Sequence, residues 1–154
     1  MLLTVAILQT SAMPSLSLSG VMPDLMLLVV VSWSLLRGTR EALLWALGGG
    51  LLLELLSGGP PGAMVVSLAL SGVVTGMGEL NLFRDSVWLP LVAGLLATGL
   101  YDLSYWVVLQ VSGRSGLGIT ILLQVMAASL VLNALVMYPT YWAMRWLNAR
   151  AGQG

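Results

Sequence analysis

The sequence predicts an all-α membrane protein, a compact bundle of six transmembrane helices. Of its 154 residues, 58% are hydrophobic and only 8% are charged, whereas soluble domains carry roughly 25% charged residues. The apolar residues fall into six runs, separated by short breaks rich in Gly, Pro, Ser or charge, which are typical of turns. No connection is long enough for a soluble domain, so we expect one integral-membrane domain covering residues 1–154.

The runs are interpreted as helices because a membrane-spanning helix needs about 20 mainly apolar residues. In order along the chain, the expected helices cover residues 1–16, 23–36, 41–56, 63–82, 87–111 and 117–147. The breaks between them read SLSLSG, RGTR, SGGPPG, FRD and SGRSGLG. The first two runs are short, reaching only about 21–24 Å at about 1.5 Å per residue. They must therefore extend into their flanks or cross a thin bilayer.

The first run, MLLTVAILQTSAMP, is interrupted by Gln9 and Pro14. It has no basic residues at its start and no clear cleavage context, unlike a secretory signal peptide. We therefore expect a helix that is retained in the protein.

The arginines predict the orientation, since loops on the cytoplasmic side are enriched in basic residues. With the N-terminus inside, five of the six arginines fall on the cytoplasmic side and Arg114 alone falls outside. The five are Arg37, Arg40, Arg84, Arg145 and Arg150. An even number of helices also returns the C-terminus to the cytoplasm.

Three carboxylates then share one membrane depth, in the outer half of three different helices: Asp24, Glu54 and Asp102. A charged group in lipid is costly unless it finds partners or becomes neutral. Together with Arg114, which could pair with any of them, they form a candidate polar site for binding a partner or for holding the bundle together.

Each acid also has a purely structural explanation. Asp24 follows a proline at a helix start, where an acid stabilises the unpaired amides. Glu54 could reach the outer interface or bond to a neighbouring helix. Asp102, in the sequence GLYDLSYW, has Tyr101, Ser104 and Tyr105 as candidate local partners.

Small residues predict where helices pack closely. The GGG stretch at 48–50 and the spacing of Gly72 and Gly76 match the small-residue patterns of packed membrane helices. Gly48, Gly50, Gly72 and Gly76 would serve packing within the chain or the docking of another protein's helix. Asn133, in the middle of the last run, should hydrogen-bond across to a neighbouring helix.

Composition narrows the chemistry that the chain can perform. The sequence has no Cys, His or Lys, which removes thiol nucleophiles, imidazole bases and the usual zinc ligands. No H-E-x-x-H motif, phosphate-binding loop or basic patch for nucleic acid is present. We therefore expect no enzyme, no metal and no cofactor. A pair of membrane acids acting as an intramembrane protease stays open as an alternative.

A set of ordered motifs resembles the rod shape-determining protein MreD family. These are Pro23-Asp24-Leu25, Arg37-Gly38, the run from Gly50 through three leucines to Glu54, Ser57-Gly58, Gly62, and the closing NALVMYPTYWAMRWL. Glu54 stands where that family more usually has Asp. The region from Gly72 to Gly116 carries little of the pattern, so the resemblance does not cover Asp102.

The resemblance implies a non-enzymatic subunit of the bacterial cell-elongation machinery in the inner membrane. Such proteins bind MreC and, through it, connect MreB filaments to the RodA glycosyltransferase and its class B penicillin-binding partner. The implied fold is similar to the six-helix substrate-binding subunits of energy-coupling-factor transporters. A subunit that binds a small solute is the alternative, and an enclosed cavity with convergent polar groups would favour it.

Overall fold

Six α-helices make up the part of the chain that the computed structural model describes, residues 1–12, 15, 17, 20–77, 86–114, 116 and 118–152. They are α1 (Leu2–Ser11), α2 (Leu25–Arg37), α3 (Thr39–Ser57), α4 (Ala63–Met77), α5 (Leu89–Val111) and α6 (Ile119–Ala151). Each apolar run of the sequence has its helix, so the all-α fold class is confirmed.

Helix bounds differ from the expected ones mainly at the two ends of the chain. α1 ends at Ser11 instead of residue 16. The hydroxyls of Thr10 and Ser11 bond to carbonyls of their own last turn, and a proline such as Pro14 disfavours the α conformation in the residue before it. α6 continues four residues further than expected. Residues 78–82 of the fourth expected helix, like Arg84, lie outside the described residues.

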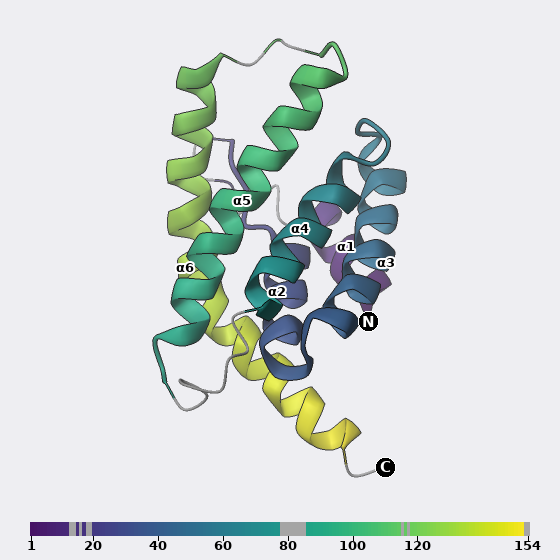
Figure 1. The fold of residues 1–154 in the computed structure, drawn as a ribbon, viewed down its shortest axis with the longest axis vertical. Coiled ribbons are helices and arrows are strands. Elements are labelled where there is room, and N and C mark those ends of the chain that lie inside the picture. The colour runs from purple at the N-terminus through teal and green to yellow at the C-terminus, as the bar shows by residue number, and fades with distance from the viewer. Residues whose placement is uncertain are drawn as a thin grey trace.

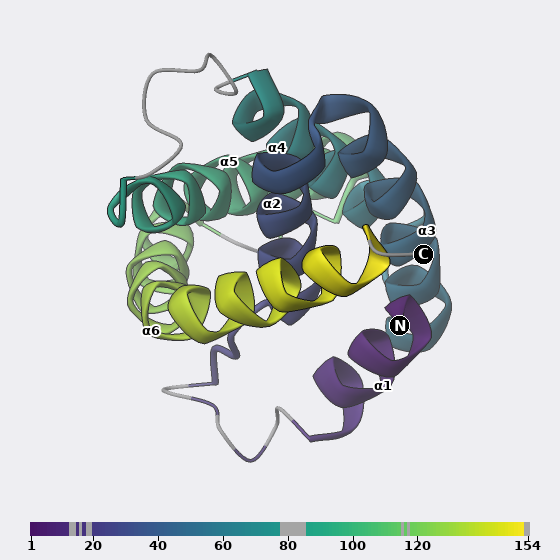
Figure 2. The same cartoon turned by 90° about the horizontal axis from the view of Figure 1, so that it is seen from below.

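α2 lies at the centre of the molecule. Figure 2 shows α3, α4, α5 and α6 around it, with α1 at the edge, and α2 contacts each of these helices. Every residue from Met26 to Ser34 is buried. A helix that is buried on all sides is apolar all round, which explains why its sequence, LMLLVVVSWSLL, shows no polar face.

Glycines let α3 and α4 approach each other and α2. A Cβ on Gly50 would lie 2.7 Å from the Cα of Val65, and one on Gly76 would lie 2.5 Å from the Oγ1 of Thr39. Both distances are too short for any side chain, so only glycine permits this packing. Two more expected packing glycines, Gly48 and Gly72, would place a Cβ 3.1 Å from Leu2 and 3.0 Å from Val30.

The molecule has two distinct ends in Figure 1. The α3–α4 and α5–α6 connections lie at one end, which we call the upper end. α3 stops there at Gly58, whose φ of 62° is left-handed and suits glycine. The α2–α3 turn and the C-terminus lie at the opposite, lower end.

α6 is the longest helix, with 33 residues, or about 50 Å at 1.5 Å per residue. This exceeds the hydrocarbon thickness of about 30 Å. Its last part, yellow in Figures 1 and 2, leaves the direction of the bundle and runs beneath it. The helix contains Pro139, and a proline removes one helical hydrogen bond and favours a bend.

The exterior of the bundle is apolar. Leu55 is 82% exposed and Leu135 is 69% exposed, which suits contact with lipid. Within the part of the chain that the structure describes, α5 and α6 are the two helices that are long and apolar enough to cross a membrane, and α1, α2 and α4 are shorter apolar helices. α3 has 19 residues but includes Arg40, Glu41 and Glu54. The clear spans are thus fewer than the six expected.

Candidate functional site

Asp24 begins α2 and receives hydrogen bonds from three elements. Its Oδ1 accepts from the backbone N–H of Leu27 at 3.1 Å, which caps the helix, and from Nε2 of Gln9 at 2.9 Å. Its carboxylate also bonds to the hydroxyl of Tyr101 on α5. The helix-start explanation therefore describes part of its role, while Gln9 and Tyr101 tie it to α1 and α5.

Two amide side chains complete this network. The Oε1 of Gln9 accepts from the backbone N–H of Met26 at 2.8 Å. A second backbone amide at the start of α2 thereby gains an acceptor. Asn133 of α6 accepts from the backbone N–H of Asp24 at 2.8 Å and donates to Oγ1 of Thr98 on α5 at 3.1 Å. These hydrogen bonds connect α1, α5 and α6 to the first turn of α2. Buried polar groups whose hydrogen bonds are all made rigidify a core.

Glu54, near the upper end of α3, caps the neighbouring helix. Its Oε1 accepts from the backbone N–H groups of Met64 at 3.0 Å and of Val65 at 3.2 Å. These belong to the first turn of α4, where amides have no partner inside the helix and the helix dipole favours negative charge. The carboxylate of Glu54, although it lies in an apolar run, is therefore close to backbone donors of α4 that need an acceptor.

Asp102 lies one residue after Tyr101 but has a different partner. Its carboxylate bonds to the side chain of Ser129 on α6. Its Oδ2 is buried and has no hydrogen-bond partner among the described residues. Such an atom is rare in folded proteins and calls for an explanation.

The expected local partners of Asp102 do not bind it, because neighbouring positions on a helix point in different directions. Tyr101 turns to Asp24, and the hydroxyl of Ser104 donates to Leu100 O within α5. The rings of Tyr101 and Tyr105 stack with centroids 6.2 Å apart.

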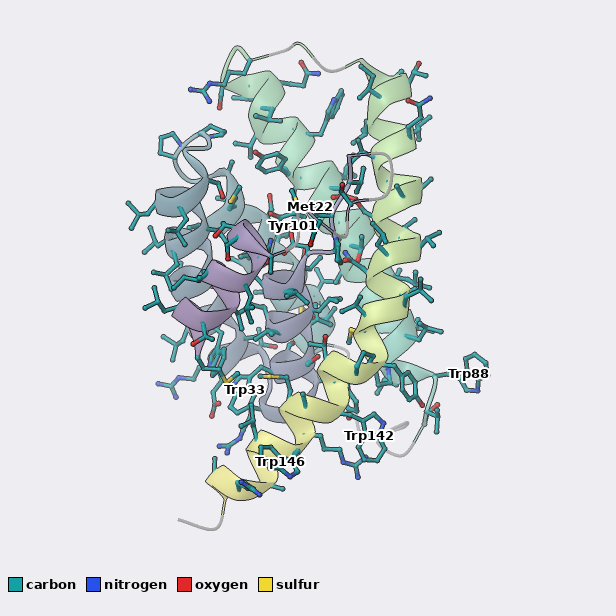
Figure 3. The ribbon with its side chains drawn as sticks, turned by 180° about the vertical axis from the view of Figure 1, so that it is seen from behind. Met22, Trp33, Trp88, Tyr101, Trp142 and Trp146 are labelled. Atoms are coloured by element: carbon teal, nitrogen blue, oxygen red, sulfur yellow. The ribbon has the colours of Figure 1, made fainter. Side chains whose placement is uncertain are left out.

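Asp24 and Asp102 line the same cavity, which has a volume of about 510 Å³. It lies between α1, α3, α5 and α6 and the segment that leads into α2. Figure 3 shows Met22 and Tyr101, two of its lining residues, close together in the upper half of the bundle. Its polar lining consists mainly of Gln9, Asp24, Ser57, Tyr101, Asp102, Tyr105, Ser129 and Asn133.

The structure thus brings together some of the predicted site residues but not all. Asp24, Asp102 and Asn133 line the cavity, while Glu54 lies beside it, next to the lining residue Leu53. Arg114 is exposed beyond the end of α5. Among the described residues it forms no ion pair with any of the three acids.

Gln9, Ser129 and the role of Tyr101 toward Asp24 were not predicted. Gln9 is the polar residue that interrupts the first apolar run, so its position gave a signal. Ser129 gave none, because a serine in a membrane helix commonly bonds to its own backbone.

A second polar cluster holds the lower end. Arg37 pairs with Glu41 at 3.6 Å and donates from Nε to Oδ1 of Asn148 at 2.6 Å. Glu41 also accepts from the indole of Trp33 at 2.8 Å, so the charges of this cluster are paired locally. In Figure 3, Trp33, Trp88, Trp142 and Trp146 all lie in this lower half, as expected for an interfacial aromatic belt.

Chemically, the upper cavity can bind and position a group, but nothing in its lining is an activated nucleophile. Its two carboxylates bond to hydroxyls, amides and backbone donors. Among the described residues, no three acidic side chains come together as metal ligands.

The fold and the site define a helical membrane protein with an apolar exterior and a polar cavity in its upper half. Comparison with protein families gives the particular family: residues 1–149 match the model of the rod shape-determining protein MreD. The chain therefore belongs to the MreD family, a family of membrane proteins that acts in rod shape determination and is not a known enzyme family. Neither curated proteins nor solved structures give a match.

Proposed function

We propose that this protein is a non-enzymatic scaffold subunit of the bacterial cell-elongation complex in the inner membrane. It binds MreC, and through that complex it helps to couple MreB filaments to RodA and its class B penicillin-binding partner. Family membership supports the role in cell shape. The absence of Cys, His and Lys from the sequence supports a binding role over a catalytic one.

The proposed topology is multi-pass, with both termini in the cytoplasm and the upper end facing the periplasm. Four of the arginines expected inside, Arg37, Arg40, Arg145 and Arg150, belong to the lower ends of α2, α3 and α6. This distribution is the one that the positive-inside rule predicts. α1, with ten residues, spans only about 15 Å, so α1 by itself is too short to make the first of the six crossings that this topology requires.

Cysteine labelling tests this topology cleanly, because the chain has no cysteine of its own. Ser112→Cys, in the upper α5–α6 connection, should react with a membrane-impermeant maleimide in spheroplasts. Ala149→Cys, at the end of α6, should react only after the membrane is opened. Labelling of Ala149→Cys in intact spheroplasts would invert the topology and remove the proposed site from the periplasm.

The observation that carries the proposed binding mode is the cavity of about 510 Å³ at the upper end. It holds two of the three predicted acids and an unpartnered carboxylate oxygen. Polar groups inside a membrane bundle are costly and mark functional sites. We assign the cavity to the membrane-proximal segment of MreC.

The test is to fill the mouth of the cavity. Ser57 is exposed and lines the cavity, whereas Leu55, two residues away on the same helix, is 82% exposed and does not line it. Ser57→Trp should abolish co-purification with MreC and the rod shape of the cell, and Leu55→Trp should preserve both. Normal co-purification with Ser57→Trp at normal protein levels would refute this binding mode.

The same cavity also supports a second candidate function, binding of a small solute, because its volume lies in the range of roughly 300–1,000 Å³ typical of ligand pockets. Native mass spectrometry of the protein released from membranes distinguishes the two. A stoichiometric small molecule that Ser57→Trp excludes would favour the solute-binding subunit, and co-purified MreC without such a molecule would favour the scaffold.

A further inference from the structure

The Oδ2 atom of Asp102 is the least satisfied polar group of the cavity. It is buried and has no donor among the described residues, whereas Ser129 interacts with the same carboxylate group. Asp24, in contrast, accepts from Leu27, Gln9 and Tyr101. Asp102 therefore retains free acceptor capacity at a point where the described residues offer no donor, which marks the position of a missing partner group.

The charge of the cavity indicates the chemistry of that group. Its described lining contains two carboxylates and no arginine, and two ionised carboxylates in one cavity repel each other. In a site with low dielectric such repulsion is strong, and a cation between the carboxylates would relieve it. The stacked rings of Tyr101 and Tyr105 lie on the same wall, and aromatic faces also attract cations.

We propose that the cavity receives a basic side chain, Arg or Lys, from the membrane-proximal segment of the partner chain, and that Asp102 Oδ2 accepts its N–H. This inference rests on the proposed scaffold function and names the group that the docking segment must carry. The carboxylate acts as the receptor for that group, and Ser129 positions it.

A protein side chain suits the cavity better than the ammonium group of an aminophospholipid. A lipid ammonium carries a phosphate only a few bonds away, and that phosphate would enter a cavity that already holds two carboxylates and offers it no arginine among the described lining residues. A Lys or Arg side chain brings positive charge without that cost. The volume of about 510 Å³ also leaves room for the backbone that carries it.

Arg114 of the same chain is the internal alternative. It is exposed, does not line the cavity and forms no ion pair with Asp102 in the described structure. The variant Arg114→Gln is therefore the matched control. It removes a charge near the upper end of the bundle and should leave binding unchanged.

The first arm of the experiment measures affinity for MreC in nanodiscs without aminophospholipid. Loss of one member of a buried charge pair typically costs about 2–5 kcal/mol, so Asp102→Asn should weaken binding at least about 30-fold. Arg114→Gln should stay within about threefold. Replacing the basic residues of MreC's membrane-proximal segment one at a time by Gln should reproduce the 30-fold loss at one position, and combining that change with Asp102→Asn should add little further loss.

The second arm uses the protein alone, so it remains informative if a variant folds poorly. Agmatine and butylammonium should raise the thermal midpoint of the unaltered protein relative to butyramide, a neutral molecule of similar size. Loss of this stabilisation on adding phosphatidylethanolamine to the nanodiscs would assign the cavity to a lipid ammonium and overturn the proposal. So would equal effects of the amines and butyramide.

The two arms separate this inference from the proposed function. If MreC does not bind the unaltered protein, the scaffold function fails. If MreC binds the unaltered protein and Asp102→Asn equally well, the scaffold function stands and the basic side chain is refuted.

Discussion

Replacing Glu54 by leucine should destabilise the bundle by about 2–4 kcal/mol, because two backbone donors at the start of α4 lose their acceptor. Glu54 Oε1 lies 3.0 Å from the amide nitrogen of Met64 and 3.2 Å from that of Val65. A buried donor left unsatisfied costs about 1–3 kcal/mol. The longer of the two bonds contributes less, and leucine recovers some apolar burial, so the expected sum falls below the upper limit.

Glutamine separates the hydrogen bonds from the charge. Glu54→Gln keeps a carbonyl oxygen of nearly the same reach, so the two N–H groups stay satisfied. It loses only the attraction between the carboxylate and the positive end of α4, about 0.5–1 kcal/mol. The expected order of stability is therefore Glu, then Gln, then Leu.

The assay is reversible unfolding in mixed micelles with increasing SDS, followed by circular dichroism and by the fluorescence of the six tryptophans. Leu55→Ala is the control, because Leu55 is 82% exposed and such positions change stability by less than about 0.5 kcal/mol. If Glu54→Leu is as stable as that control, the carboxylate does not cap α4 and the reasoning from its hydrogen bonds is wrong.

Three further predictions follow from the packing and the polar network. Gly50→Ala should cost about 1–3 kcal/mol in the same assay, because its Cβ would lie 2.7 Å from backbone of α4, whereas Gly116→Ala, with no atom within 4 Å, should cost nothing measurable. Asn133→Leu should lower stability by about 1–3 kcal/mol by leaving the backbone N–H of Asp24 unpaired; an unchanged unfolding midpoint would contradict this. Gln9→Leu removes both side-chain bonds between α1 and the start of α2, so cleavage of the α1–α2 connection by protease should accelerate about tenfold, with unchanged cleavage as the contrary result.

The fold class and the helix count could be predicted from the sequence because both depend on local composition. Apolar runs and Gly- or Pro-rich breaks specify where helices lie, whatever their neighbours do. The spacing of Gly72 and Gly76 is itself a packing signal, and a Cβ at either position would lie within 3.0 Å of a neighbouring helix. The number of helices that cross the membrane was harder to predict. Hydropathy shows where an apolar run lies, but not how many of its residues the adjoining turns take from the helix.

The partners of the acids could not be predicted in the same way. Glu54 binds amides of a different helix, and no sequence pattern in α3 shows which donors a folded neighbour will present. Asp102 and Tyr101 are adjacent in sequence, yet one faces Ser129 and the other faces Asp24. Which side of a helix meets which neighbour is a property of the assembled bundle, so the sequence supports a prediction about the depth of each acid but none about its contacts.

The cap that α3 provides for α4 has a consequence for biosynthesis. Met64 and Val65, whose backbone N–H groups donate to Glu54, follow it by only 10 and 11 residues, so acid and amides leave the ribosome within about 0.5–2 s of each other at about 5–20 residues per second. The two segments can therefore enter the lipid as a hairpin in which the charge of Glu54 is already stabilised by the free amides of α4. α5 and α6 then pack against an α3–α4 hairpin that is already connected by hydrogen bonds. In a chain stalled on the ribosome after α4, this hairpin should already resist alkaline extraction from the membrane.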